Sequence, residues 1–414
     1  MLEYYFTKAT RLRQLRRGLF GPYIDGLASE LRRAGYTTTT APYILTYAAK
    51  FSSFARASGI VDASQIDEAL VKHYLEDLAV EGAFTAAASA MRHVLEHLRR
   101  VGVIAPAKTA QGEDVVAVLL GRYDAHLRDV QGLQATTREG YVRGARKLFE
   151  WQSKRSGEKA IANLSRADVL TFVTELLESR HSAAWRSHVC SQTRVFLRYL
   201  GSAGIVPSGL DLAVPRTRRY RLSGVPRHLP WDQVRTLIDS VDTTHPSGMR
   251  DKAILLLLAT LGLRNAEVRR LELSHVAWRA GEIRLPQTKS CRERVLPMPQ
   301  ELGAALADYV LHGRPVIDAP QVFLRHKAPL GPLTSSSAVV AIVALHLRRA
   351  GLTPATRGAH LLRHSLATRM VNVGVPIKTI ADVLGHGSID TTAIYTKVDT
   401  TQLATVALPF PGGR

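Results

Sequence analysis

The sequence predicts a mainly α-helical protein with one small antiparallel β-sheet. Apolar residues recur with the 3.6-residue period of amphipathic helices along almost the whole chain. The period changes at "GEIRLPQTKSCRERVLPM" (281–298), where Ile283 and Leu285 alternate with polar residues, a turn-like "QTKSCRE" follows, and Val295 and Leu296 resume the apolar pattern. We expect a short antiparallel hairpin there, with helices before and after it.

The composition predicts a soluble, globular protein that binds a polyanion. The chain has 414 residues, enough for about two or three domains, and 46% of them are hydrophobic. Lysine and arginine number 55 against 35 for aspartate and glutamate, which gives a formal charge of +20. This excess favours nucleic acid over a membrane as the partner, because most of it is arginine, whose planar fork suits phosphate. Charge that only keeps the protein in solution is the alternative.

Cysteine usage and hydropathy indicate a cytoplasmic protein. Cys190 and Cys291 lie far apart without a CxxC partner, which argues against disulfides and thiolate metal sites. The N-terminus lacks the apolar region of a secretory signal. The most apolar run, residues 253–263, is too short to cross a bilayer and predicts a buried helix. We therefore expect no membrane partner.

The first two hundred residues carry a candidate internal duplication. Four apolar or aromatic positions recur at a spacing of 98 residues, as from position 43 to position 141, and both copies close on similar stretches, "LRRVGVIAP" and "LRYLGSAGIVP". We predict two similar helical bundles in tandem. Chance alignment of two amphipathic bundles is the alternative. The recurring pairs are Tyr43 with Tyr141, Phe51 with Phe149, Tyr74 with Phe172 and Leu78 with Leu176.

These patterns predict four segments. Residues 1–110 form a first helical bundle and residues 111–207 a second one. Residues 208–229, rich in proline, glycine and arginine, form a basic linker, and residues 230–414 form the last domain.

The linker carries a run of positive charge, made by Arg216, Arg218, Arg219 and Arg221. A solvated linker is the ordinary interpretation of such a run. In a basic protein, a strap that follows DNA phosphates is at least as good an interpretation, so these arginines are DNA-binding candidates.

The segment "AHLLRHSLATRM" (359–370) offers a polar helix face. His360 and Arg363 are three residues apart and should point into one pocket, away from the buried side that carries the leucines of this helix. His360 and His364 have the spacing of a helical zinc site. However, Leu361 stands where such a site needs a glutamate base, and no third ligand is evident. We expect no metal.

Arg264 and Lys289 are two further candidate site residues, and each also has a simpler structural interpretation. Arg264 follows the apolar run 253–263 and could merely cap the last carbonyls of that helix. Glu267, three residues later, could orient its guanidinium. Lys289 lies at the tip of the expected hairpin and, taken alone, would be an ordinary exposed lysine.

Together these residues suit chemistry on a phosphodiester. Arg264 and Arg363 would stabilise the anionic five-coordinate transition state. Lys289 could protonate the leaving alkoxide. Tyr395, in the threonine-rich "LGHGSIDTTAIYTKV" (384–398), would be the nucleophile that forms a covalent phosphotyrosine, with His386 beside the phosphate. Such an ester conserves the bond energy, so rejoining the strand needs no ATP.

At these residues the chain resembles the tyrosine recombinase, or phage integrase, family. The matching pieces are "LGLRNAEVRRL", "TKSCRERVLP", "HLLRHSLATRM" and "LGHGSIDTTAIYTKV", in the family's order and spacing. The resemblance covers the chain from about 226 to the end, and residues 117–207 resemble the family's helical core-binding domain. It implies a mixed α/β catalytic domain that breaks and rejoins DNA through a 3′-phosphotyrosine.

The resemblance also implies a role for each matched residue, for the partners and for the cofactors. Arg264 and Arg363 would bind the scissile phosphate, with Glu267 supporting Arg264. His360 would assist proton transfer from the nucleophile Tyr395. His386 would hydrogen-bond a phosphate oxygen, and Lys289 would be the general acid. The partner would be double-stranded DNA, held in a C-shaped clamp by a homo-tetramer on two DNA sites, alone or with related recombinases. Neither a cofactor nor a small-molecule substrate is implied.

Two other functions stay open. A type IB-like topoisomerase would use the same chemistry to relax supercoils without a specific site. A non-catalytic DNA-binding accessory protein would explain the charge equally well, although such a protein need not keep a nucleophile beside two phosphate-binding arginines. The first bundle departs from the minimal family pattern, and its partner could be further DNA or a neighbouring subunit.

Overall fold

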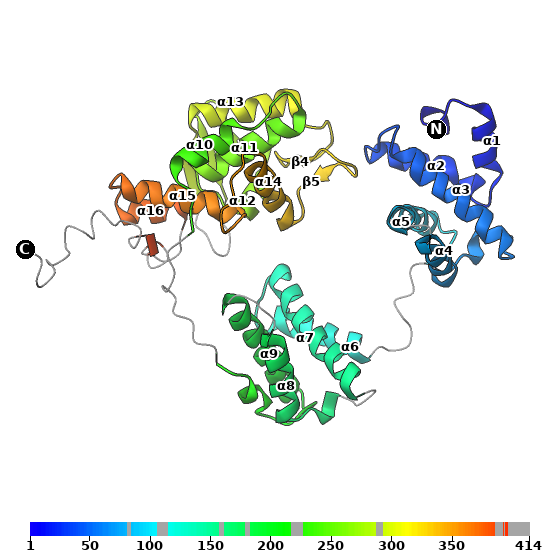
Figure 1. Cartoon of the computed structure of the whole chain (residues 1–414), viewed down its shortest axis with the longest axis horizontal. Helices are drawn as coiled ribbons and strands as arrows, with labels where there is room; N and C mark the ends of the chain where they lie inside the picture. The colour runs from blue at the N-terminus through cyan, green and yellow to red at the C-terminus, as the bar shows by residue number, and fades with distance from the viewer. Residues whose placement is uncertain are drawn as a thin grey trace, which may run out of the picture. The chain divides into compact units, whose positions relative to one another are not determined.

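The computed structural model (Figure 1) describes residues 1–80, 84–105, 115–156, 161–178, 183–216, 227–286 and 293–385, together with 392, 394 and 395. Cys291, Lys289, His386 and the linker arginines Arg218, Arg219 and Arg221 lie outside the described residues. Residues 107–223 form one compact unit, and residues 1–106 with 224–414 form the other.

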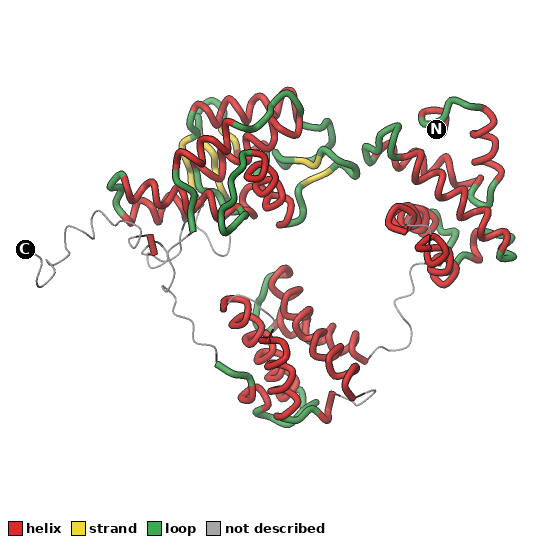
Figure 2. The backbone as a smooth tube through the Cα atoms, in the orientation of Figure 1, coloured by secondary structure: helices red, strands yellow, loops and turns green. Residues whose placement is uncertain are grey.

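Helices make up most of the described chain (Figure 2). The α-helices are α1 (Ala9–Arg17), α2 (Gly21–Arg33), α3 (Ala41–Ala57), α4 (Glu68–Val80), α5 (Phe84–Arg100), α6 (Val115–Asp129), α7 (Ala135–Ser156), α8 (Arg166–Glu178), α9 (Ala183–Ser202), α10 (Trp231–Asp239), α11 (Pro246–Thr260), α12 (Asn265–Arg270), α13 (Gln300–Asp308), α14 (Ser336–Arg349), α15 (Ala359–Asn372) and α16 (Ile377–Leu384). Short 3-10 turns occur at Leu2–Tyr4, Ala63–Gln65, Ile161–Asn163, Leu210–Ala213 and Leu273–His275, and a π-helical turn at Tyr309–Gly313 follows α13.

Two small antiparallel sheets lie in the last part of the chain. One has the order β1–β2–β3 and the other pairs β4 with β5. The strands are β1 (Val276–Ala277), β2 (Glu282–Leu285), β3 (Arg294–Pro297), β4 (Leu324–Arg325) and β5 (Gly331–Pro332). Strands β2 and β3 are the expected hairpin, with Ile283 opposite Leu296 and Leu285 opposite Arg294. The predicted class, mainly helical with a small antiparallel sheet, is thus confirmed.

Each helical bundle encloses its own hydrophobic core. In the first, helices α2 to α5 bury an apolar stripe that includes Leu45, Phe51 and Leu98. In the second, α6 to α9 bury Tyr123 and Phe196, among others. The amphipathic periods of the sequence therefore produce two separate cores, because each stripe can be covered only by the other helices of its bundle.

The second bundle extends beyond the boundary that the sequence predicts. We expected a linker from residue 208, but Leu210 and Val214 are buried in the core of this bundle. Asp211, also buried, accepts a hydrogen bond from Arg198 of α9 at 2.8 Å. This stretch is rich in proline and glycine, so its composition predicted a linker. Composition did not show that Leu210 and Val214 are buried, and the end of the bundle was therefore placed too early. Arg216 follows and is exposed.

The two bundles share an order of elements, which bears on the predicted duplication. In each, a 3-10 turn precedes the third main helix, and α4 and α8 begin 98 positions apart, at Glu68 and Arg166. Tyr74 and Phe172, at the same spacing, are both buried. The markers on α3 and α7 match less well, because the side chains of Tyr43 and Tyr141, and of Phe51 and Phe149, differ in burial. The duplication remains a prediction, supported by the common element order.

The last domain is built around α11, which carries the most apolar run of the sequence. Its residues Ala253 to Ala259 are all fully buried, as the sequence predicted. Helices α10, α13 and α15 pack against it. Within the described ranges, no helix is long and apolar enough to cross a membrane.

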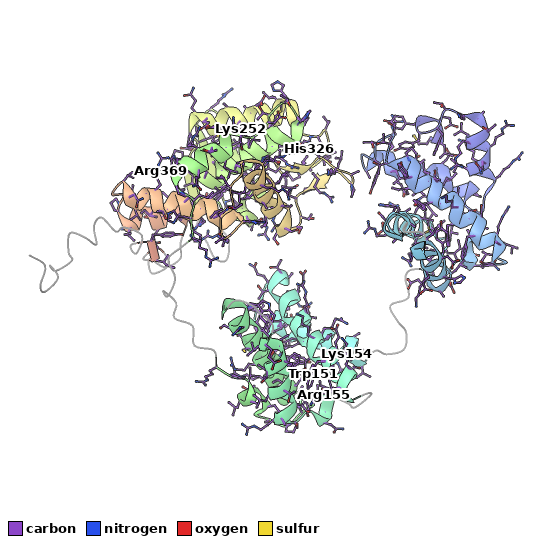
Figure 3. The ribbon with its side chains drawn as sticks, viewed as in Figure 1. Trp151, Lys154, Arg155, Lys252, His326 and Arg369 are labelled. Carbon is purple, nitrogen blue, oxygen red and sulfur yellow. The ribbon has the colours of Figure 1, made fainter. Side chains whose placement is uncertain are left out.

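Helix α15 is fixed to the start of this domain. The backbone N–H of Leu229 donates to the hydroxyl of Ser365 at 2.8 Å. The guanidinium of Arg369 lies over the Trp231 ring, 3.9 Å from its centroid. Figure 3 labels Arg369 on α15. Both contacts join α15 to the chain around α10, so the polar residues of α15 are held on a rigid element.

Candidate active site

Helix α15 carries the arginine and the histidines that the sequence singled out. Arg363 is only 3% exposed and lies among leucines that are also buried, whereas His360 is exposed. The two side chains thus differ in exposure, and their sharing of one pocket stays a prediction. The two groups still interact: desolvation lowers the pKa of His360, and the charges of Arg363 and Arg264 lower it further.

Arg264 and Glu267 are paired, as expected from their spacing. The backbone N–H of Arg264 donates to Glu267 Oε2 at 2.7 Å, and its Nη1 donates to Oε1 at 2.9 Å. Arg264 is the residue before α12, and Glu267 lies in the first turn of that helix, where a carboxylate is favoured. The carboxylate therefore fixes both the backbone and the guanidinium of Arg264.

A second arginine on Glu267 was missed from the sequence. Arg294 Nη2 donates to Glu267 Oε1 at 2.6 Å, and this side chain is 7% exposed. Burial would raise the pKa of Glu267, but the N–H of Arg264 and the charges of Arg294 and Arg264 outweigh it and lower that pKa. The alternation of the hairpin strands could have predicted this burial. Arg294 lies two residues before the buried Leu296, so both side chains lie on the same face of β3.

Three arginines from different parts of the domain converge on the end of α16. Arg294 Nη1 donates to the carbonyl of Val383 at 2.7 Å, Arg363 Nη2 to that of Leu384 at 2.6 Å, and Arg264 Nη2 to that of Gly385 at 2.6 Å. Carbonyls at a helix C-terminus lack helical partners and attract cations. The sequence allowed Arg264 to cap a helix, but the carbonyl that it caps belongs to α16.

Gly385 makes this convergence possible. It ends α16 with a left-handed backbone, φ 62° and ψ 48°. A Cβ at this position would lie 2.6 Å from Arg294 Nε, so a side chain would collide with the arginine cluster. Arg363 also donates to the carbonyl of Gly262, the left-handed glycine between α11 and α12. The arginines thus tie α16 to the α11–α12 turn and to β3.

Tyr395 lies against the same helices. It is 2% exposed and packs in a small apolar cluster with Leu366, Val371 and Leu384. Burial raises the pKa of the phenol to about 12, and the positive charge of Arg363 lowers it in part. The structure therefore brings the predicted nucleophile close to one of the two predicted phosphate-binding arginines.

The partner of the Tyr395 phenol is a residue that we had considered only as a metal ligand. His364 Nδ1 lies 2.5 Å from Tyr395 Oη, and the ring centroids are 5.6 Å apart. Desolvation, His360, Arg363 and His228 lower the pKa of His364 to about 4. The imidazole is therefore neutral at pH 7, and the protonated phenol donates to Nδ1. In the sequence, the feature that could have pointed to His364 as a site residue is its position directly after Arg363 in "LLRHS".

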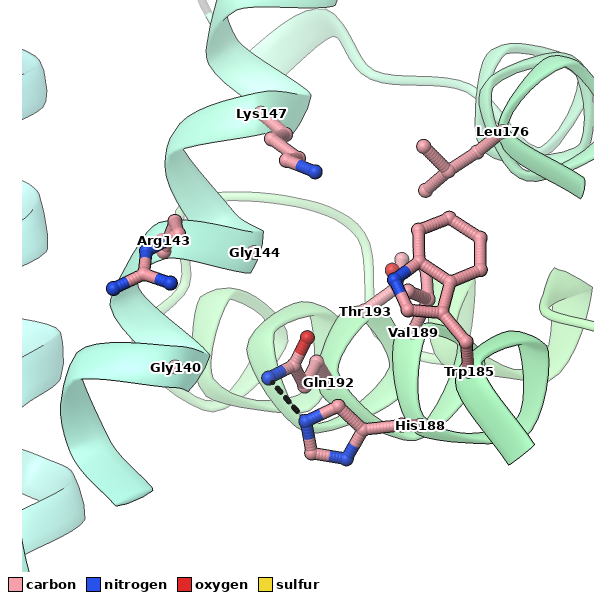
Figure 4. A pocket seen from close by; sticks show the side chains of 10 residues that line it. All are labelled: Gly140, Arg143, Gly144, Lys147, Leu176, Trp185, His188, Val189, Gln192 and Thr193. Atoms are coloured by element: carbon pink, nitrogen blue, oxygen red, sulfur yellow. Dashed lines mark hydrogen bonds between the residues drawn. The ribbon is translucent and has the colours of Figure 1, made fainter. Parts of the chain in front are cut away.

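The second bundle carries a basic groove between α7 and α9 (Figure 4). Arg143 and Lys147 line it from α7, and His188 lines it from α9 and is hydrogen-bonded to Gln192 at 2.9 Å. A Cβ at Gly144 would lie 3.0 Å from Gln192 Oε1, so the glycine allows close approach of the two helices. The groove presents cations and polar side chains together.

Family models match two parts of the chain. The model described as "Phage integrase family" matches residues 227–402, and the one described as "Phage integrase, N-terminal SAM-like domain" matches residues 120–204. The first match contains the arginine cluster and Tyr395, and the second contains the basic groove.

Relatives match over longer stretches. The Sinorhizobium fredii protein y4rF, described as an integrase/recombinase, is 40% identical over 100% of this chain and 96% of its own length. The tyrosine recombinase XerC of Oceanobacillus iheyensis is 31% identical over 62% of this chain and 84% of its own length. Similarity to y4rF thus includes the first bundle, which neither family model covers.

Solved structures match the fold. The site-specific recombinase XerH, bound to palindromic difH substrate in a post-cleavage complex, aligns with a TM-score of 0.55 at 18% identity, over 69% of this chain and 82% of that one. The Tn1549 transposon integrase in complex with a circular intermediate DNA aligns with a TM-score of 0.51 at 18% identity, over 70% and 99%. At these identities the likeness concerns the fold alone.

The fold and the matched segments define a class, the tyrosine recombinases. Since a relative 40% identical aligns with the entire chain and the family model matches the domain that carries Tyr395, this chain belongs to the phage integrase family. The expected family, and with it a recombinase that acts on DNA, is confirmed.

We predict that Glu267→Gln destabilises the protein by about 3 kcal/mol at pH 7, because it leaves two arginines without their buried counter-charge. Because the folded pKa of Glu267 is lowered, its stabilisation is present above the ordinary value of 4.5 and is lost as the pH falls through the folded value. Urea unfolding of both proteins from pH 7 to pH 3 measures this. Glu301→Gln, at an exposed ion pair with Arg235, is the control and should cost less than about 1 kcal/mol.

We predict a second pH dependence from His364. Its folded pKa, about 4, is below the ordinary value of 6.5, so the unfolded chain binds the proton first and stability falls as the pH drops from 6.5 to 4. The contribution of His364 to this loss should be about 3 kcal/mol, and His364→Asn should remove that contribution, while the one from His326, whose pKa burial also lowers to about 4, remains. Urea unfolding across this window measures the difference. His312→Asn, at an exposed histidine, should leave the wild-type slope unchanged.

Proposed function

We propose that this recombinase breaks and rejoins duplex DNA at specific sites, with Tyr395 as the nucleophile and a 3′-phosphotyrosine as the intermediate. The observation that carries the proposal is the place of Tyr395. Its phenol is hydrogen-bonded to the residue next to Arg363, and the charge of that arginine reaches it. A buried phenol beside a fixed guanidinium suits attack on a phosphodiester.

The proposed roles of the cations follow from the geometry of Arg264 and Arg363. Both guanidiniums are oriented by backbone carbonyls, so the scissile phosphate would meet donors whose direction is already set. Glu267 would keep Arg264 oriented. Such prearranged donors stabilise the charge that develops on the phosphate oxygens.

The proposed reaction conserves its atoms as follows. Tyr395 Oη attacks the phosphorus, its proton would pass to His360, and the bond from phosphorus to the 5′ oxygen breaks. Lys289 would protonate that oxygen, His360 would assist proton transfer from the phenol, and His386 would hydrogen-bond a phosphate oxygen. Attack by a 5′ hydroxyl on the phosphotyrosine reverses the steps, so neither ATP nor a cofactor is consumed.

The second bundle would bind part of the DNA. The groove between α7 and α9 offers Arg143 and Lys147 to the phosphate backbone, and the exposed Arg216 is a further cation of this bundle. We propose the division into two bundles, a linker and a catalytic domain, with the second bundle reaching at least Val214. We further propose a homo-tetramer on two DNA sites, acting in the cytoplasm, alone or with related recombinases.

The two alternatives differ in what they do to DNA. A type IB-like topoisomerase would relax supercoiled DNA without a site requirement. An accessory protein would bind without cleaving. The similarity to y4rF over the whole chain and to XerC over most of that relative favours a recombinase.

We predict that Tyr395→Phe abolishes covalent attachment to DNA and leaves DNA binding intact, because only the nucleophilic oxygen is removed. The substrates are nicked duplexes cut from the DNA that flanks the gene, in which the released strand diffuses away and traps the adduct. The measurement is the shift of the protein band on a denaturing gel. Tyr309→Phe, at another buried tyrosine of the same domain, is the control and should form the adduct. An adduct that persists in Tyr395→Phe would refute the assignment.

We also predict that DNA affinity depends strongly on salt. If the protein displaces on the order of ten counterions, affinity should fall by about 10³–10⁵ between roughly 50 and 200 mM salt. Gel-shift titration with a flanking fragment measures it. The double variant Arg143→Ala, Lys147→Ala should reduce the slope by about two, one for each lost phosphate contact. A flat salt response would contradict DNA binding by the arginine excess.

A further inference from the structure

We propose that His364 is the positioning residue of Tyr395: its Nδ1 accepts the hydrogen bond of the phenol in the DNA-free enzyme and fixes the phenol oxygen beside Arg363. This inference rests on the proposed role of Tyr395 as the nucleophile. It assigns to His364 a function that we had not predicted for it from the sequence, where the neighbouring His360 was expected to serve the phenol.

The first support is the contact itself. His364 Nδ1 and Tyr395 Oη are 2.5 Å apart, and the two rings pack at an angle of 50°. His360 lies one turn earlier on α15, with its ring centroid 6.1 Å from that of His364, and it is exposed. Within the described part of the chain, the polar side chain in contact with the phenol is therefore that of His364.

The second support is the rigidity of the element that carries His364. On one side Arg363 is tied to the carbonyls of Gly262 and Leu384. On the other side Ser365 donates to the carbonyl of Leu361 and accepts from the N–H of Leu229. A histidine between two anchored residues has little freedom, and this is what holding a nucleophile requires.

The third support is the local setting of Tyr395 among the residues that the structure describes. It lies on a short turn where its N–H donates to the carbonyl of Thr392 at 3.0 Å. Its ring packs on Leu366 and Leu384, which exclude water but do not fix the direction of the hydroxyl. The hydrogen bond to His364 supplies that direction.

The pKa values of His364 and Tyr395 decide whether His364 accepts a hydrogen bond from the phenol or removes its proton. Because burial lowers the pKa of His364 to about 4 and raises that of Tyr395 to about 12, the proton stays on the phenol. His364 is thus a hydrogen-bond acceptor in the DNA-free enzyme and a poor base. Its effect is to orient the oxygen, and the proton leaves only when the bond to phosphorus forms.

The reach of the acceptor provides a sharp test in the full-length protein. Asn places its side-chain oxygen near the position of Nδ1, Gln places it near that of Nε2, and Leu offers no acceptor. We expect His364→Leu and His364→Gln to slow single-turnover cleavage by about 10- to 100-fold, and His364→Asn to stay within about threefold of wild type. The probe is the flanking fragment that gives the Tyr395 adduct, and DNA affinity should be unchanged in all three variants.

Several outcomes of this assay would overturn the inference. Equal cleavage rates in the Leu, Gln and wild-type proteins would do so, since orientation by Nδ1 would then be irrelevant. Equal losses in Asn and Leu would also do so, because they would indicate a role in packing alone. His312→Asn, at an exposed histidine of the same domain, should cleave at the wild-type rate.

A measurement without DNA separates this inference from the proposed function. In protein labelled with ¹⁵N-histidine, the His364 signals are identified by their loss in His364→Asn. At pH 7 they should show an unprotonated Nδ1 and a protonated Nε2, and Tyr395→Phe should shift the Nδ1 signal. If Tyr395→Phe leaves that signal in place, the contact is absent and the inference fails, whatever the cleavage assay shows. If the signal shifts but no fragment gives an adduct, the proposed function fails while the contact stands.

Discussion

The arrangement of the catalytic domain depends on the capping of α16 by three arginines. Consecutive carbonyls of Val383, Leu384 and Gly385 each accept a hydrogen bond from a different arginine. A helix C-terminus has unpaired carbonyls and partial negative charge, so it can gather cations that would otherwise repel each other. The end of α16 thus helps to hold β3, α15 and the start of α12 together.

Glu267 completes this electrostatic arrangement. Two of the three arginines, Arg264 and Arg294, share its carboxylate, whose charge burial alone would disfavour. The third, Arg363, is 3% exposed, and burial and Arg264 lower its pKa to about 10. It still carries its proton at pH 7. The cluster thus stays cationic and keeps an affinity for an anion such as a phosphodiester.

Much of the fold was legible in the sequence because it follows from local patterns. The hairpin came from alternation at Ile283 and Leu285, and the buried α11 from an unbroken apolar run. The end of the second bundle was placed too early, because Leu210 and Val214 are isolated anchors in a stretch of turn-forming residues. Pairing of Arg264 with Glu267 was predictable from three-residue spacing, since both lie on one helical turn.

The sequence by itself determined the helical class, the hairpin and the set of residues suited to phosphodiester chemistry, since these depend on periodicity and residue type. Tertiary structure alone decided which of them meet. Arg294 joins the cluster because strand pairing places it against Glu267, and His364 rather than His360 reaches Tyr395 because α15 is packed in one particular rotation. Such contacts join residues 27 and 31 positions apart, and a helical or strand period cannot predict them.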